Sequence, residues 1–355
     1  MRSLSGSVRR RTAGALAVVL VVHLLAFGLL FGLVIPQHLS VDGRVFGVGL
    51  AVTAYLLGVR HAFDADHIAA IDNTTRKLVA DGKRPVSAGL FFSLGHATVV
   101  FVMAALVAAG AGVVGNLVAE DSPAHQVLGV IGVSVSGGFL ILIGLINLAA
   151  LAGIVRVWRR AMGGGLDEAA LERALDSRGL FSRLLGPAIR RVTRPGQLYP
   201  LGLLFGLGFD TATEISLLVL AGAGASTGLP WYAVLVLPLL FAAGMSLFDT
   251  LDGAFMQAAY HWSVVTPVRK VYYNLTTTGL SVAVALIVGT IEVVAVLHDR
   301  AGWNDPISSW VAGLSLDGVG YLIVGLFLVV WAGSVGYWRW GRVEQRWTER
   351  LTAAE

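Results

Sequence analysis

The sequence contains eight long apolar runs, and no other feature constrains the fold as strongly. Crossing the hydrocarbon core of a bilayer takes a helix of about 20 mostly apolar residues. Because these runs are long and do not alternate, they predict membrane-spanning helices rather than barrel strands. The predicted spans lie near 14–35, 45–71, 86–110, 127–151, 199–221, 231–257, 273–297 and 315–337. The expected fold is therefore an all-α integral membrane protein with eight transmembrane helices in a single membrane domain, residues 1–355.

Composition agrees with a chain that needs lipid around it. Of the 355 residues, 56% are hydrophobic and 14% are charged, whereas a soluble domain has roughly 25% charged residues. The chain has no cysteine, which excludes disulfides, iron–sulfur clusters and thiolate metal sites. The first apolar run is longer than the core of a cleaved signal peptide, so we expect it to be retained as a span.

The basic residues predict the orientation of the chain. With a cytoplasmic N-terminus, 23 of the 26 Lys and Arg residues fall on the cytoplasmic side, nine of them in the loop 152–198. The positive-inside rule therefore predicts a multi-pass protein of the cytoplasmic membrane with both termini in the cytoplasm. Because this basic excess is a topology signal, no nucleic-acid partner is expected.

The second predicted span carries an unusual density of charge. The stretch GVRHAFDADHIAAIDN, residues 58–73, holds the candidate site residues His61, Asp64, Asp66 and His67. The third span adds His96. The fifth adds Asp210 and Glu214, and the sixth adds Asp249 and Asp252. An ionisable group at membrane depth costs about 2.5–3.5 kcal/mol and usually marks an ion or substrate path.

A divalent cation is the ligand that best fits these side chains. Several carboxylates and imidazoles in a low dielectric repel or neutralise one another unless a cation joins them. Carboxylates alone would suit Mg²⁺ or Ca²⁺, but imidazoles shift the preference toward Ni²⁺, Co²⁺, Zn²⁺ or Cu²⁺. The absence of cysteine and the presence of only five methionines argue against a Cu(I) path. The pattern therefore predicts transition-metal permeation.

Helix geometry leaves the role of Asp66 open. At about 100° per residue, His61, Asp64 and His67 share one stripe about 120° wide, which we expect to face His96. Asp66 points about 140° from His61. Either the helix is irregular here, with Gly58 as a weak point, or Asp66 serves a neighbouring helix or orients a ligand.

Two pairs of spans resemble each other. HAFDADHIAAI in the second span and LGFDTATEISL in the fifth share Phe-Asp followed by a further acid or His and then Ile. A shift of three spans reverses direction in the membrane. The pattern therefore predicts an inverted repeat that relates spans 2–3 to spans 5–6, a usual design of secondary transporters.

Four of these segments, taken in order, resemble the nickel/cobalt transporter family (NiCoT) of eight-span permeases. The family's His-x4-Asp-His motif corresponds to His61, Asp66 and His67, and the other three segments are FSLGHATVV, LGFDTATE and GMSLFDTLDG. The resemblance implies high-affinity uptake of Ni²⁺ and/or Co²⁺ across the cytoplasmic membrane. It also implies that the second-span motif is essential for recognition, and that the metal is the transported substrate rather than a cofactor.

Other readings of the sequence remain open. An exporter of the same metals would present similar ligands. A membrane metalloenzyme is disfavoured because HExxH is absent and the histidines are too few for a di-iron site. A metal sensor would need an output domain larger than 152–198.

Besides the ions and the lipid bilayer, no partner is predicted. The metal preference, energy coupling and oligomeric state are not fixed by the sequence. Imidazoles bind metal only when neutral, so uptake should fall below about pH 6.5.

Overall fold

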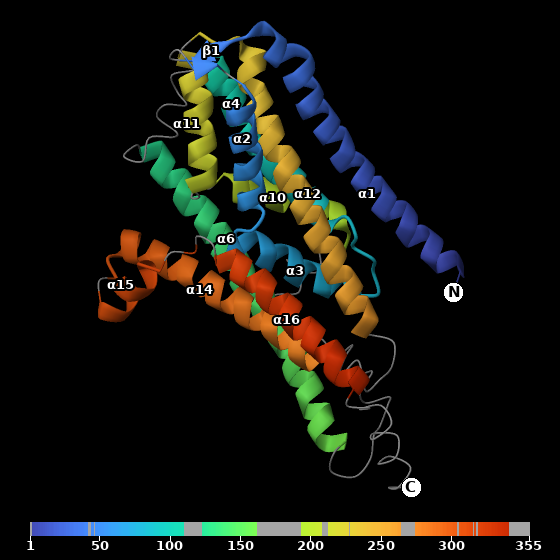
Figure 1. Cartoon of the computed structure of the whole chain (residues 1–355). Coiled ribbons are helices and arrows are strands. Elements are labelled where there is room, and N and C mark those ends of the chain that lie inside the picture. Colours follow the sequence, from blue (N-terminus) through green and yellow to red (C-terminus); the bar gives the residue numbers. More distant parts are fainter. Residues whose placement is uncertain are drawn as a thin grey trace.

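The fold is helical almost throughout (Figure 1). This computed structural model describes residues 2–41, 44–45, 47–109, 123–161, 193–207, 212–226, 228–263, 274–303, 305–314, 316 and 319–340. Within these ranges the only strands are β1 (Ser40–Val41) and β2 (Arg44–Val45), which pair antiparallel. The all-helical prediction is therefore confirmed. Most of the predicted loop 152–198, from 162 to 192, lies outside the described residues.

The α-helices differ greatly in length. They are α1 (Arg2–Leu29), α2 (Val48–His61), α3 (Ala65–Ala80), α4 (Ala88–Ala108), α6 (Pro123–Ala161), α10 (Leu198–Gly206), α11 (Ala212–Ser226), α12 (Trp231–Ser263), α14 (Gly279–Ala301), α15 (Pro306–Ala312) and α16 (Val319–Trp340). Short π- or 3₁₀-helical segments adjoin α1, α10 and α14, namely η1 (Leu30–Val34), η2 (Ile35–Gln37), η3 (Pro195–Gln197) and η4 (Asn274–Thr278).

Five helical segments are long and apolar enough to cross a membrane. They are Arg9–Gln37, Ala88–Ala108, Gln126–Gly153, Trp231–Tyr260 and Gly279–Ala301. They coincide with the first, third, fourth, sixth and seventh predicted spans. The eighth predicted span contains a shorter apolar helix, Val319–Ser334. The chain is therefore a multi-pass membrane protein, with the second and fifth predicted spans built differently.

The second predicted span, 45–71, is two helices rather than one. The helix α2 ends at His61, and α3 begins at Ala65. Between them the backbone N–H groups of Phe63 and Asp64 donate to the carbonyls of Arg60 and His61, at 3.0 and 2.9 Å. Asp64 then adopts an extended conformation and starts α3. Of the two alternatives left by the sequence, the irregular helix is confirmed, although the break follows His61 rather than falling at Gly58.

The fifth predicted span, 199–221, is also interrupted. The helix α10 ends at Gly206 and α11 begins at Ala212, with 208–211 outside the described residues. Helix α3 also extends past residue 71, the predicted end of the second span, because it continues to Ala80, and its residues 72–76 are buried. Helix α3 is therefore a buried polar helix within the bundle.

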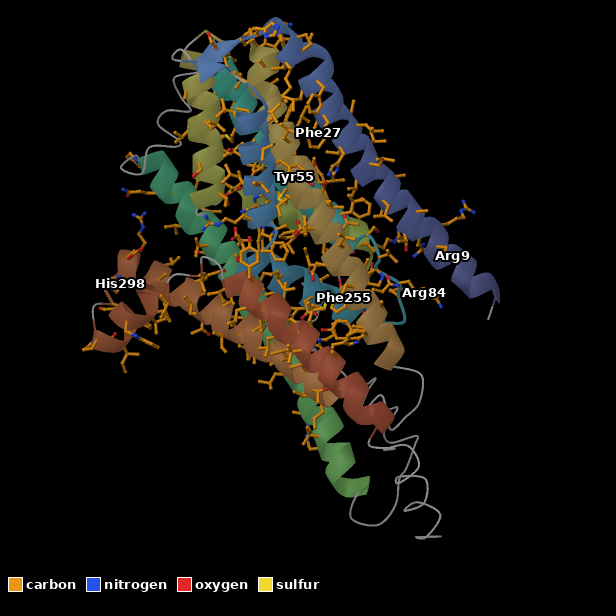
Figure 2. All side chains as sticks on the ribbon, in the orientation of Figure 1. Arg9, Phe27, Tyr55, Arg84, Phe255 and His298 are labelled. Atoms are coloured by element: carbon orange, nitrogen blue, oxygen red, sulfur yellow. The ribbon has the colours of Figure 1, made fainter. Side chains whose placement is uncertain are left out.

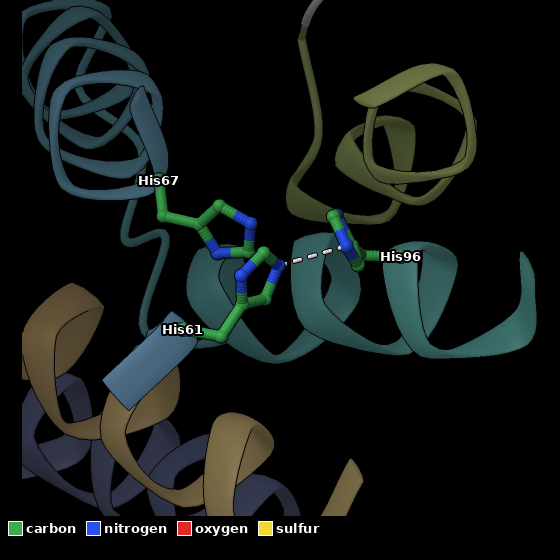
Figure 3. A group of neighbouring side chains, drawn as sticks. All are labelled: His61, His67 and His96. Atoms are coloured by element: carbon green, nitrogen blue, oxygen red, sulfur yellow. Dashed lines mark hydrogen bonds between the residues drawn. The ribbon is translucent and has the colours of Figure 1, made fainter. Parts of the chain in front are cut away.

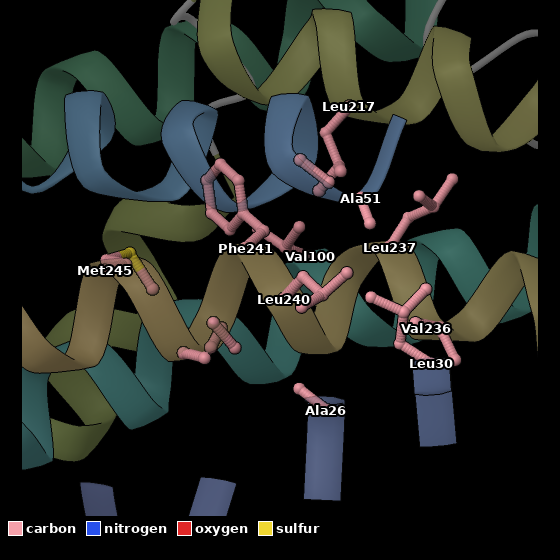
Figure 4. Close-up of a cluster of buried hydrophobic side chains, with 14 of the residues drawn as sticks. Ala26, Leu30, Ala51, Val100, Leu217, Val236, Leu237, Leu240, Phe241 and Met245 are labelled. Carbon is pink, nitrogen blue, oxygen red and sulfur yellow. The ribbon is translucent and has the colours of Figure 1, made fainter. Parts of the chain in front are cut away.

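The long helix α12 forms the centre of the fold. It packs against α1, α2, α3 and α4, while α14 packs against α6 and α3. The largest apolar core lies where α1, α2, α4 and α11 meet α12 (Figure 4), and Phe241 and Leu240 are fully buried in it. On the outer side, Phe27 of α1 faces Tyr55 of α2 with ring centroids 5.7 Å apart (Figure 2). Away from its buried stripe, α1 exposes leucines such as Leu20 and Leu24, as expected of a lipid-facing helix.

Candidate metal centre

Three histidines from three helices meet in the interior (Figure 3). His61 is the last residue of α2, His67 lies in the first turn of α3, and His96 lies in the middle of α4. Their ring centroids are 4.5, 4.6 and 4.8 Å apart, and all three side chains are buried. Each offers one ring nitrogen within 4.8 Å of the others, which is a group that can hold a metal ion. The expectation that the second-span histidines face His96 is confirmed.

The break between α2 and α3 makes this approach possible. In one regular helix, His61 and His67 would be fixed about one and two-thirds turns apart. The break at Ala62–Asp64 instead lets the first turn of α3 bring His67 to the ring of His61. His61 closes α2, where the helix dipole favours positive charge, and Asp66 lies in the first turn of α3, where it favours negative charge.

His61 is oriented by contacts on both ring nitrogens. Its Nδ1 lies 2.7 Å from Oδ2 of Asp64 and 3.0 Å from Oγ1 of Thr213. Its Nε2 lies 2.9 Å from Nε2 of His96. A proton on Nδ1 of His61, donated to the hydroxyl of Thr213, leaves the lone pair on Nε2 to bind a metal. Because two lone pairs cannot face each other at 2.9 Å, a proton or a cation must lie between these nitrogens.

Two buried carboxylates adjoin the imidazoles. Oε1 of Glu214 lies 2.5 Å from Nε2 of His96 and 4.0 Å from Nε2 of His61. Oδ2 of Asp249 lies 3.4 Å from Nδ1 of His67. Within the described residues, neither ring nitrogen of His67 and neither carboxylate oxygen of Asp249 makes a hydrogen bond. A buried polar group left unpaired costs about 1–3 kcal/mol, more if charged, and a shared cation would remove that cost.

The remaining predicted residues occupy different places. Asp64 contacts His61, whereas Oδ1 of Asp66 accepts a hydrogen bond of 2.8 Å from the backbone N–H of His67. Asp66 therefore orients the first turn of α3. Asp252 lies one turn beyond Asp249 on α12, and its electrostatic neighbours are the carboxylates of Asp249 and Asp72. Asp210 lies outside the described residues.

A close helix crossing positions His96. At Gly202 of α10 a Cβ atom would overlap the carbonyl oxygen of Phe92 on α4 and lie 3.0 Å from the backbone nitrogen of His96. At Gly95, a Cβ atom would overlap the carbonyl oxygen of Tyr199 on α10. The two helices therefore touch backbone to backbone, which only glycine allows. The contact between α4 and α10 therefore fixes the position of His96 relative to His61 and His67.

Thr213, whose hydroxyl lies 3.0 Å from Nδ1 of His61, is a site residue that was not among the predicted ligands. Its neighbour Glu214 was recognised by its charge, but a buried threonine gives no comparable signal. Replacing Thr213 with valine should weaken metal binding roughly 10–100-fold, because His61 loses an orienting contact. Serine at this position should restore most of the affinity. Isothermal titration of the purified protein measures the metal affinities of both variants. Equal affinities for Thr213→Val and wild type would contradict this role.

Together, the fold and this centre define a class of protein: a multi-pass membrane protein whose interrupted helices bring imidazoles and carboxylates together in the bundle interior, as in a transporter. Comparison with known families gives the same class. Residues 47–336 match the model of the NicO family, described as high-affinity nickel-transport protein. The chain belongs to this family of transporters, which are not enzymes, and the resemblance inferred from the four motifs is confirmed.

Individual relatives cover nearly the whole chain. The chain is 52% identical over 348 residues to the nickel transporter NicT of Mycobacterium tuberculosis, a match that covers 98% of this chain and 94% of that one. It is 42% identical over 334 residues to the nickel transporter NixA of Staphylococcus aureus, covering 94% and 96%. It is 40% identical over 331 residues to the cobalt transport protein NhlF of Rhodococcus rhodochrous, covering 92% of each. No solved structure matches the chain.

Proposed function

We propose that this protein takes up Ni²⁺ and/or Co²⁺ across the cytoplasmic membrane. The ion binds at the histidine site, defined as His61, His67 and His96, with Glu214 and Asp249 beside it. The observation that carries the proposal is the convergence of three buried imidazoles from three helices. The names of the relatives, two nickel transporters and one cobalt transport protein, support the choice of metals.

The ligand set suits these ions. Imidazole nitrogen favours Ni²⁺ and Co²⁺ over Mg²⁺ and Ca²⁺, and the lack of thiols disfavours Cu(I). A hydrated ion reaching the site exchanges water for imidazole nitrogens and carboxylate oxygens. Two positive charges crossing toward a negative interior gain about 4.6 kcal/mol per 100 mV, twice the value for a unit charge. The membrane potential alone could therefore drive uptake.

The proposed topology has eight membrane crossings and both termini in the cytoplasm. Two of the crossings are made by interrupted helices, α2–α3 and α10–α11, which correspond to the second and fifth predicted spans. The proposal draws support from the basic residues, which concentrate in the segments assigned to the cytoplasm. It places the histidine site near the middle of the membrane, where secondary transporters bind their substrates.

The same interruptions support an inverted repeat. Helices α3 and α11 both restart after a break and both carry an acid in the first turn, Asp66 and Glu214 respectively. Each restart follows one of the two Phe-Asp motifs that suggested the repeat. We propose that spans 2–3 and 5–6 are related halves that bring these helix starts to one site from opposite sides.

Accumulation of ⁶³Ni and ⁵⁷Co in cells expressing the protein tests both the substrate and the direction of transport. Uptake predicts more cell-associated metal than in cells carrying an empty vector, and dissipating the membrane potential should reduce the excess. Less metal in expressing cells would identify an exporter instead. Equal accumulation of both isotopes with and without the protein would contradict the proposed function.

A further inference from the structure

A second group of polar side chains, buried except for the half-buried Asp252, lies further along α3 and α12 than the histidine site. It contains Asp72 on α3 and Asp252 and Tyr260 on α12. The hydroxyl of Tyr260 donates to Oδ1 of Asp72 and lies 2.7 Å from the hydroxyl of Ser281 on α14. Asp249, which adjoins His67, is one helical turn before Asp252. The acids therefore form a row that begins beside the histidine site.

Helix geometry directs this row toward α3. On α12, Asp249, Asp252, Met256 and Tyr260 recur at three- and four-residue spacing and share one face. That face packs on α3, as the contact of Tyr260 with Asp72 shows. Asp252 lies along α12 between Asp249, which adjoins His67, and Tyr260, which contacts Asp72, and its carboxylate interacts electrostatically with those of Asp72 and Asp249.

Several oxygens of these carboxylates make no hydrogen bond within the described residues. Within the described part of the chain, no hydrogen bond reaches Oδ2 of Asp72, Oδ2 of Asp252 or either oxygen of Asp249. Asp72 and Asp249 are both 0% exposed. Neighbouring carboxylates repel each other when ionised, and burial removes the water that would otherwise solvate them. Arg76 supplies one positive charge beside Asp72, and a divalent cation between the carboxylates would add further positive charge and contact the oxygens that make no hydrogen bond.

We propose that Asp72 and Asp252 form a second cation site, the carboxylate site, which receives the ion from the histidine site through Asp249. Its ligands are oxygens, which bind hard divalent ions such as Mn²⁺ more readily than the imidazole centre does. Because α3 runs on toward the turn assigned to the cytoplasm, the carboxylate site lies on the inward side. Only the inward location of the carboxylate site rests on the proposed function. The binding of a cation by Asp72 and Asp252 does not.

Arg76 is expected to weaken metal binding at the carboxylate site, which favours release of the ion over its retention. Its guanidinium interacts electrostatically with Asp72 and Tyr260, and its Nη1 donates a hydrogen bond of 3.1 Å to Thr278. A metal ion at Asp72 must compete with this fixed positive charge. Conduction requires sites that are strong enough to admit an ion and weak enough to let it leave. The carboxylate site should accordingly bind metal less tightly than the histidine site.

Binding of Mn²⁺ to the purified full-length protein, followed by electron paramagnetic resonance, tests the carboxylate site. Asp252→Asn should weaken Mn²⁺ binding about 10-fold or more. His67→Ala should change it by no more than about twofold, because the two sites are separate. Asp252→Asn should conversely leave tight Ni²⁺ binding within about twofold, which also shows that the variant is folded. Asp72→Asn keeps an acceptor for Tyr260 and should behave like Asp252→Asn.

The matched control is Asp299→Asn, which removes an acid whose side chain is 70% exposed at the end of α14. The carboxylate site would be overturned if Asp252→Asn left Mn²⁺ binding unchanged. It would also be overturned if His67→Ala and Asp252→Asn weakened it equally, since both residues would then belong to one site. Because these measurements use purified protein, they give an answer even if the ⁶³Ni experiment contradicts uptake.

Discussion

Replacing His67 with alanine is expected to abolish high-affinity metal transport. Changing a residue that merely orients a metal ligand costs about 10–100-fold in affinity, so removing a ligand should cost about 100-fold or more. His67 is 0% exposed, and its ring lies 4.5 and 4.8 Å from those of His61 and His96. The measurement is the initial rate of ⁶³Ni accumulation over a range of nickel concentrations, normalised to protein in the membrane.

The matched control for this variant is His298→Ala. His298 lies in the last turn of α14 beside Asp299 and does not contact the histidine site. The same chemical change there should leave transport close to wild type. If His67→Ala transported nickel as well as His298→Ala, the three imidazoles would be a structural network rather than a metal site. A loss of His67→Ala from the membrane would instead call for measuring metal binding by His61→Ala and His96→Ala.

The second large effect is expected at the crossing of α4 and α10. In a helix interior, replacing glycine with alanine normally stabilises by up to about 1 kcal/mol. At Gly202 the added methyl group would overlap the carbonyl oxygen of Phe92. Overpacking of this kind costs about 1–3 kcal/mol, equivalent to a fall of roughly 2–12 °C in the thermal midpoint. Transport should fall as well, because the methyl group would also press on the backbone nitrogen of His96.

Gly138→Ala provides the comparison. Gly138 lies in α6, and a Cβ atom there would have no heavy atom within 4 Å. This variant should melt at or slightly above the wild-type temperature, whereas Gly202→Ala should melt below it. The midpoint can be followed from the fraction of monodisperse protein that remains after heating in detergent. Identical midpoints for the two variants would show that α4 and α10 are not held in backbone contact.

Much of the site could be predicted because charge in an apolar chain is conspicuous. His61, His67, His96, Glu214 and Asp249 each interrupt a hydrophobic run, and all five converge. The prediction that His61 and His67 face His96 is confirmed, but the single regular helix on which it was based is wrong, because the helix breaks after His61. Asp72 lies on the same stripe, but periodicity alone could not show that it faces Tyr260 rather than the histidines.

The helix breaks were harder to predict because they depend on packing against residues that are distant in the sequence. The segment Ala62–Asp64 contains neither glycine nor proline. A hydropathy average taken over a whole span does not reveal a break of three residues. The break is held by distant residues: Phe63 stacks on Tyr321 and lies against Phe248, with ring centroids at 4.7 and 5.3 Å. Gly320 of α16 lies so close to the carbonyl of Phe63 that a Cβ atom would overlap it. Long-range packing of this kind leaves no local pattern.

The orientation of Asp66 could not be predicted for the same reason. A regular helix placed its carboxylate away from the histidines, so its role depended on whether the helix continued. Once α3 starts at Ala65, Asp66 falls in the first turn, where an acid binds free backbone N–H groups. Its position in the His-x4-Asp-His motif therefore fits a role in orienting His67 as well as a role in binding metal.

X-ray absorption at the nickel edge of the purified, nickel-loaded protein tests most directly whether one ion is held where α2, α3 and α4 meet. Imidazole rings give a distinctive multiple-scattering pattern whose strength counts the rings bound. The expected result is three imidazoles on one nickel ion in the wild type and two in His67→Ala. A spectrum fitted by oxygen ligands alone, or one that His67→Ala leaves unchanged, would contradict the histidine site.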